Sequence, residues 1–214
     1  MLPKLQVALD LLKIEDALKI AYEVVDYVDY IEAGTPLIKS CGVKAIEVLK
    51  REFSDKIIVA DMKTADTGYL EAKIAFENGA DYTTVLLYAD VETISKALEA
   101  AREFNRGVMV DTIGYWKSDD IISKLRGLKP DYLIIHSGID MQHRGIKPFK
   151  LTSEIVSRNI EIPIGVAGGL NSSNIRLLKG FKIDLIIVGG AIVKADKPSE
   201  AAKSIRKVLE TTFT

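Results

Sequence analysis

The sequence contains a single cysteine, Cys41, among its 214 residues. One cysteine cannot form a disulfide within the chain, which excludes the small disulfide-stabilised secreted domains and predicts a reducing, cytoplasmic location. A nucleophilic role for Cys41 is an alternative, but no neighbouring residue supplies the base that such a thiol needs. We therefore interpret Cys41 as a small residue that packs near a turn.

An excess of charge of one sign is also missing. The chain has 29 Lys and Arg residues against 30 Asp and Glu residues, a formal net charge of −1. A nucleic-acid-binding protein usually gathers a basic excess on one face, so we expect no nucleic-acid partner. No apolar run approaches the ~20 residues of a membrane-spanning helix, so we expect no membrane segment. The pattern at residues 1–6 does not resemble a signal peptide, because it lacks a charged start and a long apolar core.

What the sequence does contain is a regular alternation of short apolar runs with amphipathic stretches. The runs are rich in β-branched residues and recur at roughly 20 to 30 residues, the length of one strand, one helix and two short loops. They span residues 5–9, 28–31, 57–60, 82–86, 107–110, 132–135, 164–167 and 185–188.

The stretches between these runs have the period of a helix with one buried face. The clearest are Ala17, Ile20, Ala21 and Val24, and later Ile94, Ala97, Leu98 and Ala101. Apolar strands that alternate with helices predict a parallel sheet covered by helices on its outer side. Eight such units favour a single (β/α)₈ TIM barrel over residues 1–214, with no linker and no second domain.

A doubly wound open sheet is the main alternative fold. Such a sheet usually carries a glycine-rich dinucleotide-binding turn after its first strand. This chain has Asp10-Leu11-Leu12-Lys13 at that place, which favours the barrel.

Ionisable residues gather at the predicted carboxyl ends of the strands, where a barrel collects its functional groups. Five of the eight ends carry them, and the last two strands end in glycine pairs. In chain order these residues are Asp10, Glu32, Asp61 with Lys63 and Asp66 just beyond, Asp111, His136, Gly168-Gly169 and Gly189-Gly190.

The segment Asp61-Met62-Lys63 places a carboxylate and an ammonium group two residues apart. Alternate residues of an extended strand point to the same side, so both groups are expected at the barrel mouth. Asp61 would keep Lys63 cationic, and a fixed cation stabilises a developing enediolate oxygen. A structural ion pair at the rim is the alternative interpretation.

Glu32 and Asp61 end neighbouring strands, so their carboxylates are expected to lie close together. Two like charges so placed require a proton or a cation between them. A hard divalent ion such as Mg²⁺ satisfies that requirement through carboxylate and substrate oxygens. The alternative is that Lys63 and water alone neutralise the two groups.

Glycine pairs after the last two strands of a barrel commonly let a phosphate approach the main chain, although glycine pairs also serve left-handed turns. His136 follows a buried strand, so we predict a general acid/base at the mouth. His143 lies in a polar loop and is expected to be exposed to solvent. Tyr115 and Trp116 follow Gly114 and either cover the mouth or pack at the start of a helix.

Several motifs along nearly the whole chain resemble the orotidine 5′-phosphate decarboxylase suprafamily, and within it the 3-hexulose-6-phosphate synthase branch. They are Leu5-Gln6-Val7-Ala8-Leu9-Asp10, Glu32-Ala33-Gly34-Thr35-Pro36, Ala60-Asp61-Met62-Lys63-Thr64-Ala65-Asp66-Thr67-Gly68, Asp111-Thr112-Ile113-Gly114, His136-Ser137-Gly138-Ile139-Asp140, Val166-Ala167-Gly168-Gly169 and Val188-Gly189-Gly190-Ala191-Ile192.

The resemblance implies a role for each candidate residue. Glu32 and Asp61 would hold Mg²⁺, with Mn²⁺ as a substitute, and Asp10 and Lys63 would complete the polar floor. Asp66 would reach the neighbouring subunit's site in a homodimer. Asp111 and His136 would handle hydroxyl groups and protons of the substrate. The phosphate would be bound by Gly168, Gly169, Gly189, Gly190 and Ala191.

The activity implied by the resemblance is the reversible addition of formaldehyde to D-ribulose 5-phosphate through a 1,2-enediolate. A related decarboxylase that acts on 3-keto-L-gulonate 6-phosphate forms the same intermediate. That relative typically has an arginine after the strand-six histidine, where this chain has Ser137, and a glutamate in place of Asp111. The decarboxylase also has Gly-Arg in the last phosphate loop, where this chain has Gly189-Gly190. In contrast, the segment Gly114-Tyr115-Trp116 of this chain resembles the decarboxylase more than the synthase. A silent barrel that only binds a sugar phosphate is a further alternative.

Overall fold

The computed structural model of the chain describes residues 2–115, 117–145 and 147–213. Eight parallel strands pair in sequence order and close into a barrel in which β1 pairs with both β2 and β8. This closure confirms the predicted TIM barrel and excludes the open doubly wound sheet. The strands are β1 (Lys4–Leu9), β2 (Tyr30–Ala33), β3 (Ile57–Thr64), β4 (Tyr82–Leu86), β5 (Gly107–Asp111), β6 (Tyr132–His136), β7 (Ile164–Ala167) and β8 (Leu185–Val188).

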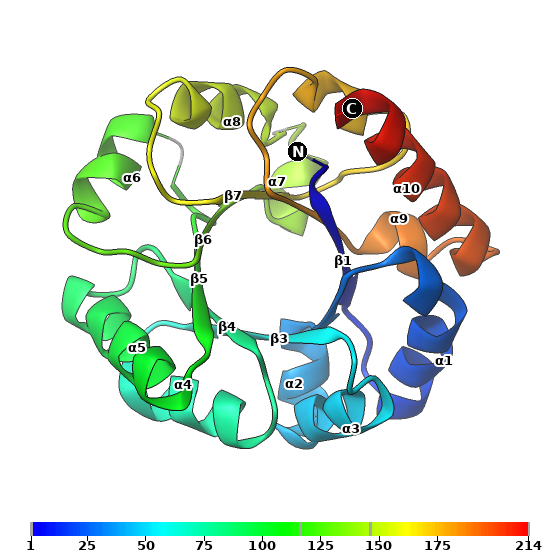
Figure 1. The fold of residues 1–214 in the computed structure, drawn as a ribbon, viewed down its shortest axis with the longest axis horizontal. Coiled ribbons are helices and arrows are strands. Elements are labelled where there is room, and N and C mark those ends of the chain that lie inside the picture. The colour runs from blue at the N-terminus through cyan, green and yellow to red at the C-terminus, as the bar shows by residue number, and fades with distance from the viewer. Residues whose placement is uncertain (1, 116, 146, 214) are drawn as a thin grey trace.

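Helices form a ring around the outside of the strands (Figure 1). Those predicted from helical periodicity are confirmed, because Ala17, Ala21 and Val24 are buried on α1 and Ile94 and Ala97 on α5. The helices are α1 (Ile14–Val24), η1 (Val25–Tyr27), α2 (Thr35–Cys41), α3 (Lys44–Glu52), α4 (Gly68–Glu77), α5 (Val91–Phe104), α6 (Ser118–Lys124), α7 (Ile139–His143), α8 (Phe149–Val156), η2 (Ile175–Leu178), α9 (Gly190–Val193) and α10 (Pro198–Phe213). Across the described residues, none of them is both long and apolar enough to cross a membrane.

The second strand begins later than its apolar run predicts. Val28 is 3% exposed, but it lies outside β2 and follows the short helix η1. Val28 is therefore apolar because it is buried in the core, not because it belongs to the sheet. β2 also ends later than the apolar run, at Ala33, so it includes Glu32, which the sequence placed at the strand's end.

The amino-terminal end of the barrel is built from a repeated unit of two strands. An aspartate stands directly before each even-numbered strand and accepts a hydrogen bond from a main-chain amide of the preceding odd-numbered strand. The pairs are Leu5–Asp29, Ile58–Asp81, Val108–Asp131 and Ile164–Asp184, each with a nitrogen–oxygen distance of 2.8 Å. The repeat links neighbouring strands at the end opposite the site.

Three tyrosines follow three of these aspartates and pack together inside the same end of the barrel. The Tyr82 ring centroid lies 5.9 Å from that of Tyr30 and 5.8 Å from that of Tyr132, and the hydroxyl groups of Tyr30 and Tyr132 are 3.2 Å apart. Burial raises the pKa of Tyr82 to about 12, so these phenols stay neutral. The cluster fills the amino-terminal end and leaves the cavity to the opposite end.

Candidate active site

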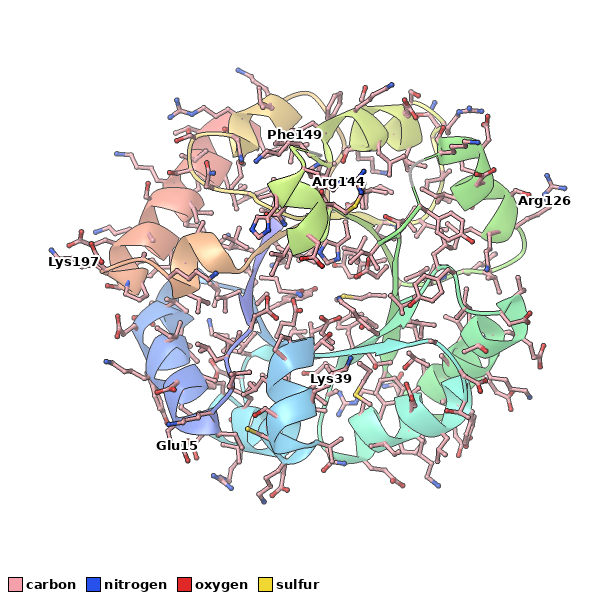
Figure 2. All side chains as sticks on the ribbon, turned by 180° about the vertical axis from the view of Figure 1, so that it is seen from behind. Glu15, Lys39, Arg126, Arg144, Phe149 and Lys197 are labelled. Carbon is pink, nitrogen blue, oxygen red and sulfur yellow. The ribbon has the colours of Figure 1, made fainter. Side chains whose placement is uncertain are left out.

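A cavity of about 740 Å³ opens at the carboxyl end of the barrel. The helices α2 and α7 flank this opening, where Figure 2 labels Lys39 and Arg144. The cavity brings together all of the predicted site residues except Asp66. Those that line it are Asp10, Glu32, Asp61, Lys63, Asp111, His136, Gly168, Gly169, Gly189, Gly190 and Ala191.

Lys63 reaches the cavity through an irregular strand, not through regular alternation. The pairing of β3 with β4 shifts between Ala60 and Thr64, so that residues 61–63 lie opposite Thr84 alone. Lys63 has a φ of 47°, a left-handed conformation that is uncommon for a residue with a side chain. Its amide donates to Thr84 Oγ1 at 2.9 Å, which stabilises the bulge. The predicted proximity of Asp61 and Lys63 is therefore confirmed, but the predicted reason for it is wrong.

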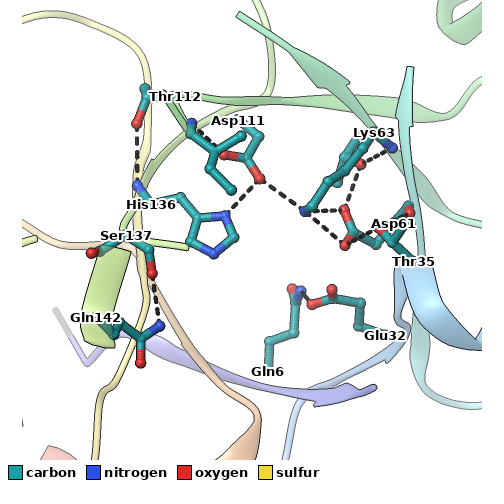
Figure 3. A network of polar contacts seen from close by, with 12 residues as sticks. Gln6, Glu32, Thr35, Asp61, Lys63, Asp111, Thr112, His136, Ser137 and Gln142 are labelled. Atoms are coloured by element: carbon teal, nitrogen blue, oxygen red, sulfur yellow. Dashed lines mark hydrogen bonds and ion pairs between the residues drawn. The ribbon is translucent and has the colours of Figure 1, made fainter. Parts of the chain in front are cut away.

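The Lys63 ammonium group is held between two carboxylates of different strands. Its Nζ donates to Asp61 Oδ1 at 2.9 Å, to Asp61 Oδ2 at 2.8 Å and to Asp111 Oδ2 at 3.1 Å (Figure 3). Burial alone would lower the pKa of Lys63, but the charges of Asp61, Asp111 and Glu32 raise it above its usual value. The geometry thus maintains a fixed positive charge inside the cavity.

Asp61 is 4% exposed, and its two oxygens accept four hydrogen bonds. Besides Lys63, Thr84 Oγ1 donates to Oδ1 and Thr35 Oγ1 donates to Oδ2, each at 2.7 Å. Burial raises the pKa of Asp61, yet Lys63 and the threonine hydroxyl outweigh burial and lower it. Asp61 is therefore ionised at neutral pH.

Asp111 joins the ammonium group to the imidazole of His136. Its Oδ2 lies 2.8 Å from His136 Nδ1, and its Oδ1 accepts from the amide of Ile113 at 2.8 Å. Burial opposes ionisation of Asp111, but the charges of His136 and Lys63 hold the pKa of Asp111 well below its usual range. The His136 amide donates to Thr112 Oγ1 at 3.1 Å, which fixes the backbone from which the ring projects. This arrangement orients the imidazole with an ionised carboxylate.

Glu32 has a different environment from Asp61, although both are buried. Glu32 is 6% exposed, and Gln6 Nε2 donates to its Oε2 at 2.5 Å. Burial, and then the charges of Asp61 and Asp10, raise the pKa of Glu32 well above its usual value. A carboxylate so placed is stabilised by a proton or by a cation. The donor set fits a divalent ion shared by Glu32 and Asp61, with substrate and water oxygens as the remaining ligands.

The protein offers few ligands besides these two carboxylates. Within residues 2–115, 117–145 and 147–213, no group of three or more His, Cys, Asp or Glu side chains is arranged to hold a metal ion. Such a site suits Mg²⁺, which usually keeps several water or substrate ligands and binds through one or two carboxylates. It does not suit a structural zinc ion, which requires four protein ligands.

Asp10 lies at the mouth beside the start of α2. A Cβ atom on Gly34 would meet Asp10 Oδ1 at 2.3 Å, so the absence of a side chain at Gly34 allows this close approach. Burial, followed by the charge of Asp61, raises the pKa of Asp10, whereas Lys63, His136 and Lys194 lower it. The net result is a pKa of Asp10 above its usual value.

The two glycine pairs have unequal structural constraints. Gly168 has a φ of 108°, and a Cβ atom there would lie 2.2 Å from the carbonyl oxygen of Ser137. Gly169 also has a positive φ, of 66°, and its carbonyl oxygen accepts from Asn174 Nδ2 at 2.8 Å. At Gly190, in contrast, the nearest atom to a Cβ would be 3.9 Å away. Packing therefore explains the first pair in part, while the second leaves its main chain open to the cavity.

Several predictions fall outside this cavity. Asp66 is exposed, and its Oδ1 accepts from the Thr67 amide at 2.7 Å, so its role toward a second subunit stays a prediction. Tyr115 packs against the hydrophobic core and does not line the cavity, which supports the packing interpretation. Trp116 lies outside the described residues. His143 is exposed as predicted, although it sits at the cavity rim.

Cys41 is half-buried at the end of α2, where its Sγ lies 3.4 Å from the carbonyl oxygen of Leu12. It is not part of the cavity wall. The structure therefore supports a packing role for this residue.

Sequence reasoning missed the neutral groups that orient the charged ones. Thr35, Thr84 and Gln6 contact the carboxylates, and threonine in a strand or at a helix start carries no distinctive signal. Gln6 could have been found, because a glutamine within an otherwise apolar strand is unusual. Lys147 and Lys194 also line the cavity and were not identified.

Comparison with known proteins identifies close relatives over the full length. A family model described as orotidine 5′-phosphate decarboxylase / HUMPS family matches residues 3–205. A 3-hexulose-6-phosphate synthase from Mycobacterium gastri is 42% identical over 208 residues, covering 96% of this chain and 99% of the relative. The crystal structure of 3-hexulose-6-phosphate synthase from Salmonella typhimurium is 37% identical, with a TM-score of 0.94, and covers 98% of this chain and 99% of that one.

A decarboxylase structure is less similar. The 3-keto-L-gulonate-6-phosphate decarboxylase from Vibrio cholerae is 29% identical, with a TM-score of 0.83, and each chain is covered completely. The motifs that suggested the resemblance therefore lie in a chain whose whole length matches. The chain belongs to the orotidine 5′-phosphate decarboxylase / HUMPS family.

Proposed function

We propose that this chain is an aldehyde-lyase that acts as a 3-hexulose-6-phosphate synthase. It joins formaldehyde reversibly to C1 of D-ribulose 5-phosphate and forms D-arabino-hex-3-ulose 6-phosphate. The synthase relatives are 36–42% identical to it, whereas the Vibrio cholerae decarboxylase is 29% identical. The observation that carries the chemistry is the Lys63 ammonium group, fixed 2.8 Å from Asp61 and 3.1 Å from Asp111 in the cavity.

The reaction requires a proton to leave C1 of the sugar and a new carbon–carbon bond to form there. The C2 carbonyl oxygen gains negative charge as the C1 proton is removed, and the Lys63 ammonium group stabilises that charge. The resulting carbon nucleophile attacks formaldehyde, whose oxygen then takes up a proton. In this proposal His136, whose Nδ1 lies 2.8 Å from Asp111 Oδ2, takes the proton from C1 and returns it to the product oxygen.

We propose that Glu32 and Asp61 hold Mg²⁺, for which Mn²⁺ can substitute. When bound, such an ion polarises the oxygens of the substrate and stabilises negative charge on them. The support is that the carboxylates of Glu32 and Asp61 are both buried and line the same cavity, where the charge of Asp61 adds to burial in raising the pKa of Glu32 and so favours a cation beside it.

We assign the phosphate of the substrate to the main chain of the two glycine pairs and Ala191, and the rest of the sugar to Asp10 and Lys63, which line the same cavity. These residues line one continuous cavity of about 740 Å³, a volume suited to a pentose phosphate together with formaldehyde.

The active unit proposed here is a homodimer in which Asp66 enters the partner's site. Asp66 is exposed and lies two residues after the end of β3 and two residues before the start of α4. Mixing a Lys63→Ala variant with an Asp66→Ala variant tests this arrangement, because a mixed dimer has one site with both residues intact. Recovery of roughly a quarter of wild-type activity is expected for random pairing. No recovery after verified subunit exchange would contradict the shared site.

The direct test of the reaction uses pure protein with D-ribulose 5-phosphate, formaldehyde and Mg²⁺. Formaldehyde should be consumed in step with formation of the hexulose phosphate, and a chelator should stop the reaction. Release of CO₂ from 3-keto-L-gulonate 6-phosphate without formaldehyde consumption would indicate the decarboxylase instead. Binding of the sugar phosphate with neither reaction would indicate a silent barrel.

A further inference from the structure

The cavity contains a positive charge that has no role in the chemistry described above. Lys194 lines the cavity and directly follows the short helix α9, which begins at Gly190. Its amide donates to the carbonyl oxygen of Gly190 at 3.1 Å. A side chain on a helix leans toward the helix start, so residue 194 covers residue 190. Accordingly, a Cβ atom on Gly190 would lie 3.9 Å from Lys194 Cδ, which places the lysine stem above the second glycine pair.

The charge of Lys194 is not used by a neighbouring acid. Among the described residues, the salt bridges do not include Lys194, whereas Lys63 is bound by Asp61 and Asp111. The charge of Lys194 acts on Asp10. Burial and Asp61 raise the pKa of Asp10, and Lys194 is one of three positive groups that oppose this rise. Lys194 thus faces the cavity with an ammonium group available to a ligand.

The chemistry of the ligand explains why a cation is needed at this place. A phosphate monoester carries about −1.5 to −2 charges near neutral pH. The cavity already contains the carboxyl groups of Asp10, Glu32, Asp61 and Asp111, which repel an anion. Main-chain amides of the glycine pairs can donate hydrogen bonds to a phosphate, but they supply no net charge.

We propose that Lys194 binds the phosphate group of the substrate and thereby selects phosphorylated over free sugars. This inference rests on the proposed function for the identity of the sugar, and it adds a residue that the glycine pairs do not provide. Lys194 is a binding residue in this assignment, remote from the carbon atoms that react.

Lys147 is the other uncommitted lysine of the cavity wall, and it serves as the comparison. Lys147 follows α7 and precedes α8. Unlike Lys194, it is not among the atoms nearest to a Cβ placed on either glycine pair. The position of the Lys194 stem over Gly190 therefore favours Lys194 as the phosphate ligand.

The experiment compares wild type with Lys194→Met, Lys194→Arg and Lys147→Met. The matched control is Lys197→Met, because Lys197 lies on the outer surface, pairs with Glu200 at 2.9 Å and carries the same charge (Figure 2). Two quantities are measured for each protein: the affinity for D-ribulose 5-phosphate by calorimetry without formaldehyde, and the kinetics of formaldehyde consumption. Inorganic phosphate serves as a competitor in both.

Lys194→Met should weaken sugar-phosphate binding and raise KM by about 5- to 20-fold, the range for one charge-assisted contact that solvent partly screens. Inhibition by inorganic phosphate should weaken in parallel, and the difference from wild type should shrink as salt is added. Lys194→Arg should restore most of the affinity, and Lys197→Met should match wild type.

Unchanged affinity in Lys194→Met, or a loss found only in Lys147→Met, would overturn the proposal. A loss of kcat with unchanged KM would also overturn it, because that result assigns Lys194 to the chemistry. The proposed reaction fails separately, if wild type binds D-ribulose 5-phosphate but consumes no formaldehyde, and the binding comparison then still decides the role of Lys194.

Discussion

Replacing Lys63 by methionine removes the charge on which the proposed chemistry depends and keeps most of the side-chain volume. In the wild type, the ammonium group lies 2.8 and 2.9 Å from the two oxygens of Asp61 and 3.1 Å from Asp111. The side chains of these acids are only 6% and 4% exposed. The variant would therefore leave two buried carboxylates without their cation.

The stability loss follows from that burial. Removing one partner of a buried ion pair costs roughly 3–5 kcal/mol of unfolding free energy at neutral pH. The sign of the pH dependence is fixed by the lowered pKa values of Asp61 and Asp111, since groups with depressed pKa contribute stability above their unfolded values. That contribution is lost as the pH falls through the folded values, so wild type and Lys63→Met should converge in stability in acid.

The activity loss has a separate cause. Without the ammonium group, the negative charge that develops on the substrate oxygen loses about 2–4 kcal/mol of stabilisation. That range corresponds to a decrease in kcat of roughly 30- to 1000-fold. Formaldehyde consumption at saturating substrate measures it, and urea unfolding between neutral and acid pH measures the stability.

Two further variants separate charge from backbone strain. Lys63→Gly also lacks the ammonium group, but glycine adopts the φ of 47° at Lys63 without strain, so it should be more stable than Lys63→Met and equally impaired in kcat. Lys96→Met removes a surface lysine that pairs with Glu99 at 2.7 Å and should behave as wild type. The reasoning is refuted if Lys63→Met retains kcat within threefold, or if its destabilisation does not change with pH.

Three other predictions follow from the structure. Because the pKa of Glu32 is raised, a divalent ion must displace the proton of Glu32 when it binds. The affinity for Mn²⁺, measured by electron paramagnetic resonance, should therefore rise with pH by up to about tenfold per pH unit until Glu32 ionises without the metal. An affinity that does not change with pH would contradict the assignment. Gly168→Ala should lower stability by at least about 2 kcal/mol in chemical unfolding, because its Cβ would meet the Ser137 oxygen at 2.2 Å, whereas Gly190→Ala should cost less than half as much. Burial opposes ionisation of Asp29, but the Leu5 amide and Arg206 lower its pKa. The Asp29→Asn variant should therefore lose about 1 kcal/mol of unfolding free energy at neutral pH and none in acid below the folded pKa of Asp29. A difference in stability that persists in acid would exclude this electrostatic origin.

Much of the architecture was determined by the sequence alone. Eight apolar runs separated by helical periodicity predict a barrel, because parallel strands must be buried on both faces and connected by helices. The polar residues at strand ends were placed correctly at one mouth for the same reason, since all parallel strands direct their carboxyl ends the same way. Asp61, Asp111 and His136 could thus be grouped before any contact was known.

Only the tertiary structure decided how these groups interact. The bulge that gives Lys63 its φ of 47° depends on the register between β3 and β4, which no local pattern in the sequence specifies. Likewise, Thr35 and Thr84 come from different elements and meet at Asp61 only after the barrel closes. Glu32 and Asp61 are both buried, but their pKa values shift in opposite directions. Asp61 contacts the Lys63 ammonium group, whereas Glu32 experiences the charges of Asp61 and Asp10. Burial and charge are sums over neighbours distant in the chain, so folding decides them and composition does not.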